Sequence, residues 1–175
     1  MDGTLLDSER LWDVALEELA VVLGGTLRPE VRDRMVGTNE DASVIFLLED
    51  LGLPVEDFPE HVQWLRERMK TLFAIGAAWK PGAQELLHEV RAAGIPTALV
   101  TDPEPYATAA AKLGVDPARS FAIEDSPSGS ESALAAGAVT FTVPSEVALP
   151  ESIPAHRLAT LDGVTLATLR AIAAA

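Results

Sequence analysis

The second half of the chain alternates short apolar runs with segments of helical periodicity, and this alternation restricts its fold more than any other feature. Apolar runs at 95–100, 120–123 and 139–143 have the length of buried strands. Helical segments at 82–93, 106–113 and 131–136 each end next to a glycine. Strands that alternate with helices in this way form parallel sheets with helices on their faces. The sequence therefore predicts a doubly wound α/β core.

The first part of the chain shows helical periodicity instead. Apolar residues recur at spacings of three and four over 8–23, 44–51 and 61–73, and Pro29 begins a short helix over 28–35. We therefore expect an all-helical block at 8–78. The α/β core is then formed by residues 1–7 and 79–175, and the Ala-rich tail after Asp162 predicts a last helix packed on the sheet.

The composition narrows the possible partners. The chain is 48% hydrophobic, which is enough for a packed core. Its 27 acidic and 13 basic residues give a formal charge of −14, which disfavours nucleic acid and anionic membranes as partners. It contains no Cys, which excludes disulfides, thiolate catalysis and Cys-bound zinc. The sequence resembles neither a signal peptide nor a membrane span, so we expect a cytoplasmic protein that is a monomer or weak dimer.

Acidic residues follow two of the predicted strands. Asp102 lies just beyond the first, and Glu124 and Asp125 follow the second. Ligands of parallel sheets bind beyond the carboxyl ends of the strands, and clustered carboxylates there suit Mg²⁺. The next helix begins at 126–129, and its free N–H groups favour an anion. The alternative is that these Asp and Ser residues are only helix caps.

Four sequence motifs, in order, resemble those of the haloacid dehalogenase-like (HAD) phosphatases and phosphomutases. Residues 2–9, DGTLLDSE, resemble the end of the first motif, D-x-D-G-T, with the D-S-E that follows it in the β-phosphoglucomutase-like group. Residues 98–101 resemble the second motif, a strand that ends in Ser or Thr, and 103–106 resemble the end of the third, K-P-x-P-D/E-P-Y. Residues 122–129 closely resemble the fourth, E-D-S-x-x-G. The chain is identified as a member of this group.

The resemblance implies a Rossmann-like core with a helical cap, residues 8–78, that closes over the site and selects the substrate. It also implies Mg²⁺-dependent transfer of a phosphoryl group from a small phosphorylated metabolite, such as a sugar phosphate, through an aspartyl phosphate. Asp2 would act as general acid and base, and Thr101 would donate a hydrogen bond to the phosphoryl oxygens. Asp2, Glu124 and Asp125 would hold the Mg²⁺. The residues expected to contact substrate are Thr4, Thr101, Asp102, Arg34 and Gly37.

The chain departs from the family pattern in two ways. The nucleophilic Asp of the family lies two positions before Asp2, whereas this sequence begins at Met1, so we expect that the chain is truncated there and lacks the central first strand of the sheet. No Lys precedes Pro103, and one further strand between the second and third motifs is missing. We therefore expect three parallel strands at most and reduced stability. Two functions stay open: a phosphoryl-transfer hydrolase, and an inactive remnant that binds Mg²⁺ or phosphate.

Overall fold

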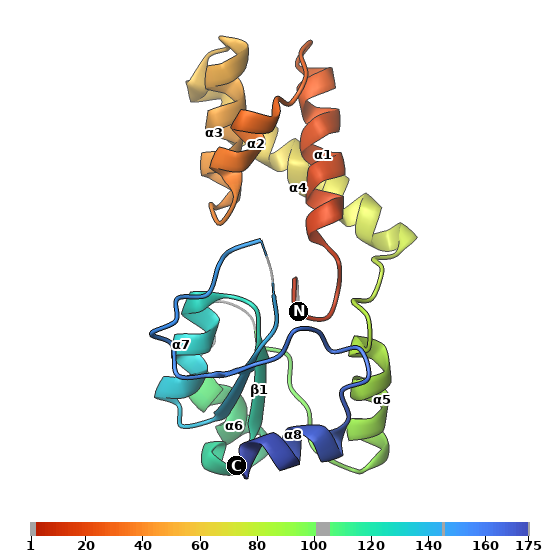
Figure 1. The fold of residues 1–175 in the computed structure, drawn as a ribbon. Helices are drawn as coiled ribbons and strands as arrows, with labels where there is room; N and C mark the ends of the chain where they lie inside the picture. Colours follow the sequence, from red (N-terminus) through yellow and green to blue (C-terminus); the bar gives the residue numbers. More distant parts are fainter. Residues whose placement is uncertain (1–2, 101–105, 145, 175) are drawn as a thin grey trace. The chain divides into compact units, whose positions relative to one another are not determined.

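The computed structural model describes residues 3–100, 106–144 and 146–174 of the chain. The chain divides into two compact units, one made of Met1–Asp7 with Trp79–Ala175 and the other of Ser8–Ala78 (Figure 1). Each unit has its own cluster of buried apolar side chains. In the parts of the chain that the structure describes, no helix has the length and apolar character needed to cross a membrane.

The unit at 8–78 is helical, as the periodicity predicts. Helices α1 and α3 both pack on α4, and α2 packs on α3. The centre of the unit is aliphatic, with Leu19, Leu47 and Leu65 at most 1% exposed. Its elements are α1 (Glu9–Val22), α2 (Pro29–Met35), α3 (Glu40–Leu51), the 3-10 helix η1 (Val55–Asp57) and α4 (Phe58–Ile75).

The other unit has the α/β architecture that the alternation predicts. In the described part of this unit, the strands of the sheet lie in the order β1-β2-β3 and are all parallel, which agrees with the upper limit of three strands. The two-residue strand β3 was not predicted. The elements are α5 (Ala83–Ala92), α6 (Tyr106–Leu113), η2 (Pro117–Arg119), β1 (Phe121–Glu124), α7 (Pro127–Ala135), β2 (Val139–Thr142), β3 (His156–Arg157) and α8 (Leu166–Ala173).

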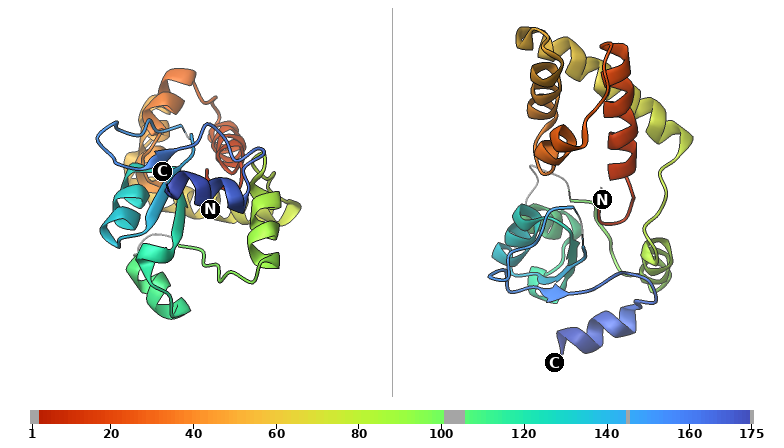
Figure 2. Two further views of the ribbon diagram at one scale, coloured as in Figure 1. Left: turned by 60° about the horizontal axis from the view of Figure 1, so that its bottom comes forward. Right: turned by 45° about the horizontal axis from the view of Figure 1, so that its top comes forward.

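The two faces of the sheet carry different layers of helices (Figure 2). Because successive side chains of a strand point to opposite faces, Ile123 and Phe141 pack in one cluster with Leu86 of α5 and Leu169 of α8. Ala122 points to the other face and packs with α7 in a separate cluster. Helices α5 and α8 contact each other, whereas α6 contacts α7. The result is a small sheet between two helical layers.

A close backbone approach holds α5 against the loop before α8. Gly82 precedes α5 and has φ of 77°, a left-handed conformation that favours glycine. A Cβ atom at this position would also collide with the backbone carbonyl of Leu161. Glycine is therefore required here both by the conformation and by the space.

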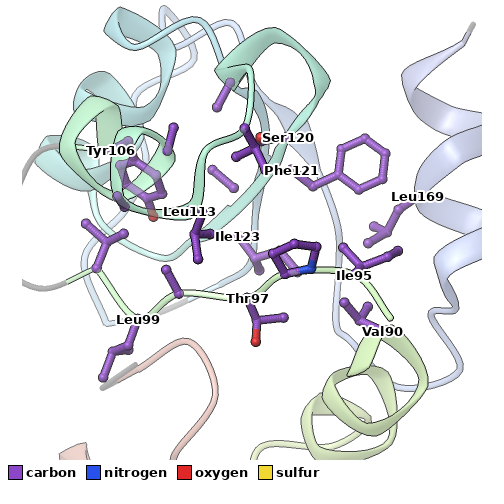
Figure 3. A pocket seen from close by; sticks show the side chains of 18 of the residues that line it. Val90, Ile95, Thr97, Leu99, Tyr106, Leu113, Ser120, Phe121, Ile123 and Leu169 are labelled. Atoms are coloured by element: carbon purple, nitrogen blue, oxygen red, sulfur yellow. The ribbon is translucent and has the colours of Figure 1, made fainter. Parts of the chain in front are cut away.

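The predicted strand at 95–100 is wrong, because this segment has no regular secondary structure. Strand β1 is hydrogen-bonded to β2 along one edge, and the segment lies beside a cavity on the other side of β1 (Figure 3). A strand needs a neighbour for its backbone N–H and C=O groups, and among the described residues the recorded strand partner of β1 is β2, not this segment. The apolar side chain of Leu99 is consequently 54% exposed.

Replacement of Phe141 by Ala is expected to destabilise the α/β unit by about 3–5 kcal/mol, the usual loss for a buried Phe. Phe141 is fully buried, its ring centroid lies 5.4 Å from that of Phe121, and it stacks on His156 with 5.1 Å between centroids. Native-state hydrogen exchange of the β2 amides measures this loss separately from the helical unit. Phe121→Ala is the matched control, since Phe121 is 37% exposed. An equal loss in both variants would contradict the prediction.

Candidate functional site

The predicted acidic pair lies where β1 ends and α7 begins. Glu124 is the last residue of β1, and Asp125 directly follows it. The hydroxyl Oγ1 of Thr4 donates a hydrogen bond of 2.6 Å to Oδ1 of Asp125, although 121 residues separate the two. Thr4 is only 3% exposed. The structure thus brings together three of the predicted site residues, Thr4, Glu124 and Asp125.

The Glu124 carboxylate is held by side chains from two helices. The hydroxyl of Tyr106, the first residue of α6, donates a hydrogen bond to Oε1 of Glu124. Oγ of Ser126 lies 3.4 Å from Oε2. Burial, together with the neighbouring Glu124, raises the pKa of the Tyr106 hydroxyl far above its usual range, so that this hydroxyl stays protonated and donates. Sequence reasoning did not assign a role to Tyr106, although the third motif contains it.

The sequence left open whether Asp and Ser residues here are caps or ligands, and the structure gives them different roles. Ser126 is the N-cap of α7: its Oγ accepts a hydrogen bond of 3.1 Å from the Gly129 amide. Pro127 occupies the first position of the helix, where a missing N–H is tolerated. The carboxylates of Glu124 and Asp125 instead accept hydrogen bonds from hydroxyl groups of Tyr106 and Thr4.

The oxygen donors at this position fit a hard divalent cation. Mg²⁺ is bound in proteins by one or two carboxylates and keeps several waters. A carboxylate oxygen that accepts one hydrogen bond still has a second lone pair for a metal. Asp2, the third predicted ligand, lies outside the described residues. Among the described residues, no group of three His, Cys, Asp or Glu side chains could hold a metal ion. Of the three predicted Mg²⁺ ligands, the structure therefore describes only Glu124 and Asp125.

The remaining predicted site residues lie outside the described part of the α/β unit. Thr101 and Asp102 lie outside the described residues. Arg34 of α2 and Gly37, which has φ of 74°, belong to the helical unit. The Arg34 guanidinium has Nη2 3.4 Å from Oε2 of Glu49 and lies 4.3 Å above the ring centre of Phe46. A substrate role for Arg34 and Gly37 stays a prediction.

A cavity of about 420 Å³ within the α/β unit borders Glu124. Figure 3 shows aliphatic side chains of Val90, Ile95, Leu113 and Ile123 around it. Thr4, Tyr106 and Glu124 also line it, so that the Glu124 carboxylate lies at its polar border. Burial of an uncompensated phosphate against aliphatic groups is unfavourable. We therefore do not assign the phosphate site to the interior of this cavity.

Comparisons with known proteins find phosphatases that are similar in sequence to this chain. A probable pseudouridine-5'-phosphatase of Drosophila melanogaster is 27% identical, over 82% of this chain and 79% of that protein. A phosphatase of phosphorylated carbohydrates from Thermotoga maritima is also 27% identical, over 78% of this chain and 79% of its own length. The crystal structure of beta-phosphoglucomutase from Clostridium difficile superimposes with a TM-score of 0.67 at 15% identity, covering 99% of this chain and 94% of that one, and shows the same fold.

The family itself is shown by a family model described as haloacid dehalogenase-like hydrolase, which matches residues 1–126. The match spans the helical unit, the segment that follows it, and the acidic pair at the end of β1. The chain therefore belongs to the haloacid dehalogenase-like hydrolase family, and the resemblance drawn from its motifs is confirmed.

Proposed function

We propose that this hydrolase transfers a phosphoryl group from a small phosphorylated metabolite, a sugar phosphate, and requires Mg²⁺ for the reaction. The observation that carries the proposal is the adjacent carboxylate pair at the end of β1, with Asp125 fixed by the Thr4 hydroxyl. Two carboxylates at successive positions of the chain offer the oxygen donors that a hard divalent cation prefers. The N-terminus of α7, directly after the pair, offers N–H groups to an anion.

The proposed chemistry assigns different tasks to the residues of the site. Glu124, Asp125 and Asp2 would hold Mg²⁺, which when bound neutralises charge on the phosphoryl oxygens. In the family's reaction, an Asp two positions before Asp2, which this sequence does not contain, attacks phosphorus and displaces the leaving group. Asp2 would protonate that leaving group and then take a proton from the water that hydrolyses the aspartyl phosphate. Thr101 would donate a hydrogen bond to the phosphoryl oxygens. Thr4 keeps the Asp125 carboxylate oriented, in addition to any contact with substrate.

The choice of a sugar phosphate is supported by the names of the relatives. One is a phosphatase of phosphorylated carbohydrates, and the other is a probable pseudouridine-5'-phosphatase. Both names describe phosphatases of phosphorylated small molecules. We propose the same class of substrate here, with the helical unit at 8–78 as the cap that selects within it.

A second function is favoured by one feature of the sequence. Thr101 and Asp102 run directly into Pro103, where the family pattern has a lysine before the proline. A phosphate site without that cation stabilises the charge of the transferring group less well. The alternative function is therefore binding of Mg²⁺ and phosphate without turnover. Measuring both binding and hydrolysis with the same protein distinguishes this alternative from phosphoryl transfer.

Asp125→Asn is expected to lower Mg²⁺-dependent hydrolysis of an aryl phosphate by roughly 100-fold or more, a loss similar to that of a main charge-stabilising group. The amide keeps the shape of the side chain and can still accept from Thr4, but it no longer supplies a charged ligand to Mg²⁺. The measurement is initial rate against Mg²⁺ concentration for both proteins. Glu131→Gln is the matched control, because Glu131 is an exposed residue of α7 that also loses one negative charge.

The two candidate functions give different results in this experiment. Hydrolysis that requires Mg²⁺ and is lost in Asp125→Asn supports phosphoryl transfer. Binding of Mg²⁺ and inorganic phosphate by the folded chain without hydrolysis supports the alternative. Hydrolysis that is unchanged in Asp125→Asn would contradict the proposed metal site.

Arg34→Ala tests the proposed role of the helical unit in substrate selection. We expect KM for a phosphorylated sugar to rise by roughly 10-fold, the effect of about 1.4 kcal/mol of lost binding, while KM for a small aryl phosphate changes little. Arg28→Ala is the matched control, since Arg28 lies in the same unit and forms an exposed ion pair with Asp50. Equal effects of the two variants on KM would exclude a specific role for Arg34.

A further inference from the structure

We propose that Tyr106 is a positioning residue for Glu124, and that its hydroxyl sets the Mg²⁺ affinity of the acidic pair. The inference rests on the metal site proposed above and adds a residue to which no role in it is assigned. It is carried by the hydrogen bond from Tyr106 to Oε1 of Glu124 and by the packing around both side chains.

Tyr106 reaches Glu124 from a fixed base. Tyr106 is the first residue of α6, and its ring packs against the buried cluster of Ala122, Ala133 and Ala138. These alanines belong to β1, to α7 and to the turn before β2. Because the partly buried ring packs against these three segments of the α/β unit, its packing directs the hydroxyl toward Glu124. Figure 3 shows the ring at the border of the cavity.

The side chain of Glu124 is also restricted in its conformation. A Cβ atom at Gly129 would collide with the Glu124 carboxylate, so the carboxylate lies directly against the first turn of α7. On the same side, Oγ of Ser126 lies 3.4 Å from Oε2. Helix α7 thus supports one side of the carboxylate, and the Tyr106 hydroxyl holds its other oxygen.

These contacts order the carboxylate before a cation arrives. A metal that binds to a free side chain must first restrict its rotamers, and that cost lowers affinity. Hydrogen bonds to a metal-binding carboxylate remove much of this cost, and their loss typically weakens metal binding by 10–100-fold. A hydroxyl group is suited to this task because it orients the carboxylate without cancelling its charge.

The alternative is that Tyr106 only fills space between α6 and the sheet. Tyr106→Phe separates the two roles, because it keeps the ring and removes the hydroxyl. We expect it to weaken Mg²⁺ binding by about 10-fold, measured without substrate by a chemical-shift titration of the Gly129 amide. Thr97→Val is the control, because it removes another hydroxyl from the cavity lining, on the segment 95–100 rather than on α6.

The same titration in Glu124→Gln and in the double variant tests whether Tyr106 acts through Glu124. If it does, Tyr106→Phe has no further effect once Glu124 is replaced. A second readout uses the fact that Tyr106 is the only tyrosine of the chain. Biosynthetic fluorotyrosine labels this one position, and its ¹⁹F resonance should shift on addition of Mg²⁺ in the otherwise unaltered chain and not in Glu124→Gln.

The outcomes separate this inference from the metal site on which it rests. Unchanged Mg²⁺ affinity in Tyr106→Phe, together with loss of binding in Asp125→Asn, would overturn the role of Tyr106 and leave the site standing. An equal loss from Tyr106→Phe with and without Glu124 would also overturn it. A chain that shows no Mg²⁺ binding at all would overturn both.

Discussion

The hydrogen bond from Thr4 to Asp125 is the constraint on which the site depends, because it joins the start of the chain to the end of β1 across 121 residues. The neighbouring residues strengthen the same connection. Leu6 forms an antiparallel bridge with Trp79, and the Lys80 amide donates to the Leu5 carbonyl at 2.8 Å. The chain therefore leaves the α/β unit and returns to it at adjacent points. An insertion of helices between them need not disturb the sheet or its acidic edge.

Periodicity and position along the chain predict much of this fold. Helices such as α4 and α6 follow from apolar spacing, and the acidic pair follows from its place after an apolar run, since ligands collect at the carboxyl ends of parallel strands. The prediction of a strand at 95–100 is wrong, because a strand also needs a neighbouring strand for its backbone groups. The local sequence does not show whether such a neighbour is present. The role of Tyr106 could not be predicted from local sequence either, because its hydrogen bond to Glu124 depends on how α6 packs beside the end of β1.

The two units also handle their charges differently. In the helical unit, Asp and Glu side chains are paired with arginines, as Glu18 is with Arg68 and Asp13 with Arg32. These pairs are half-buried, and ion pairs that water still reaches contribute little to stability. The aliphatic core of the unit therefore supplies most of its stability.

At the end of β1, by contrast, the side chains that hold Glu124 are the hydroxyls of Tyr106 and Ser126. A hydroxyl donor fixes the direction of a carboxylate and leaves its charge in place, whereas a guanidinium would neutralise it. Asp125, the next residue along the chain, likewise accepts a hydrogen bond from a hydroxyl, that of Thr4. In the metal site proposed above, orientation by hydroxyl groups would leave the negative charge of the carboxylates available to Mg²⁺, so that the same contacts would serve both geometry and charge.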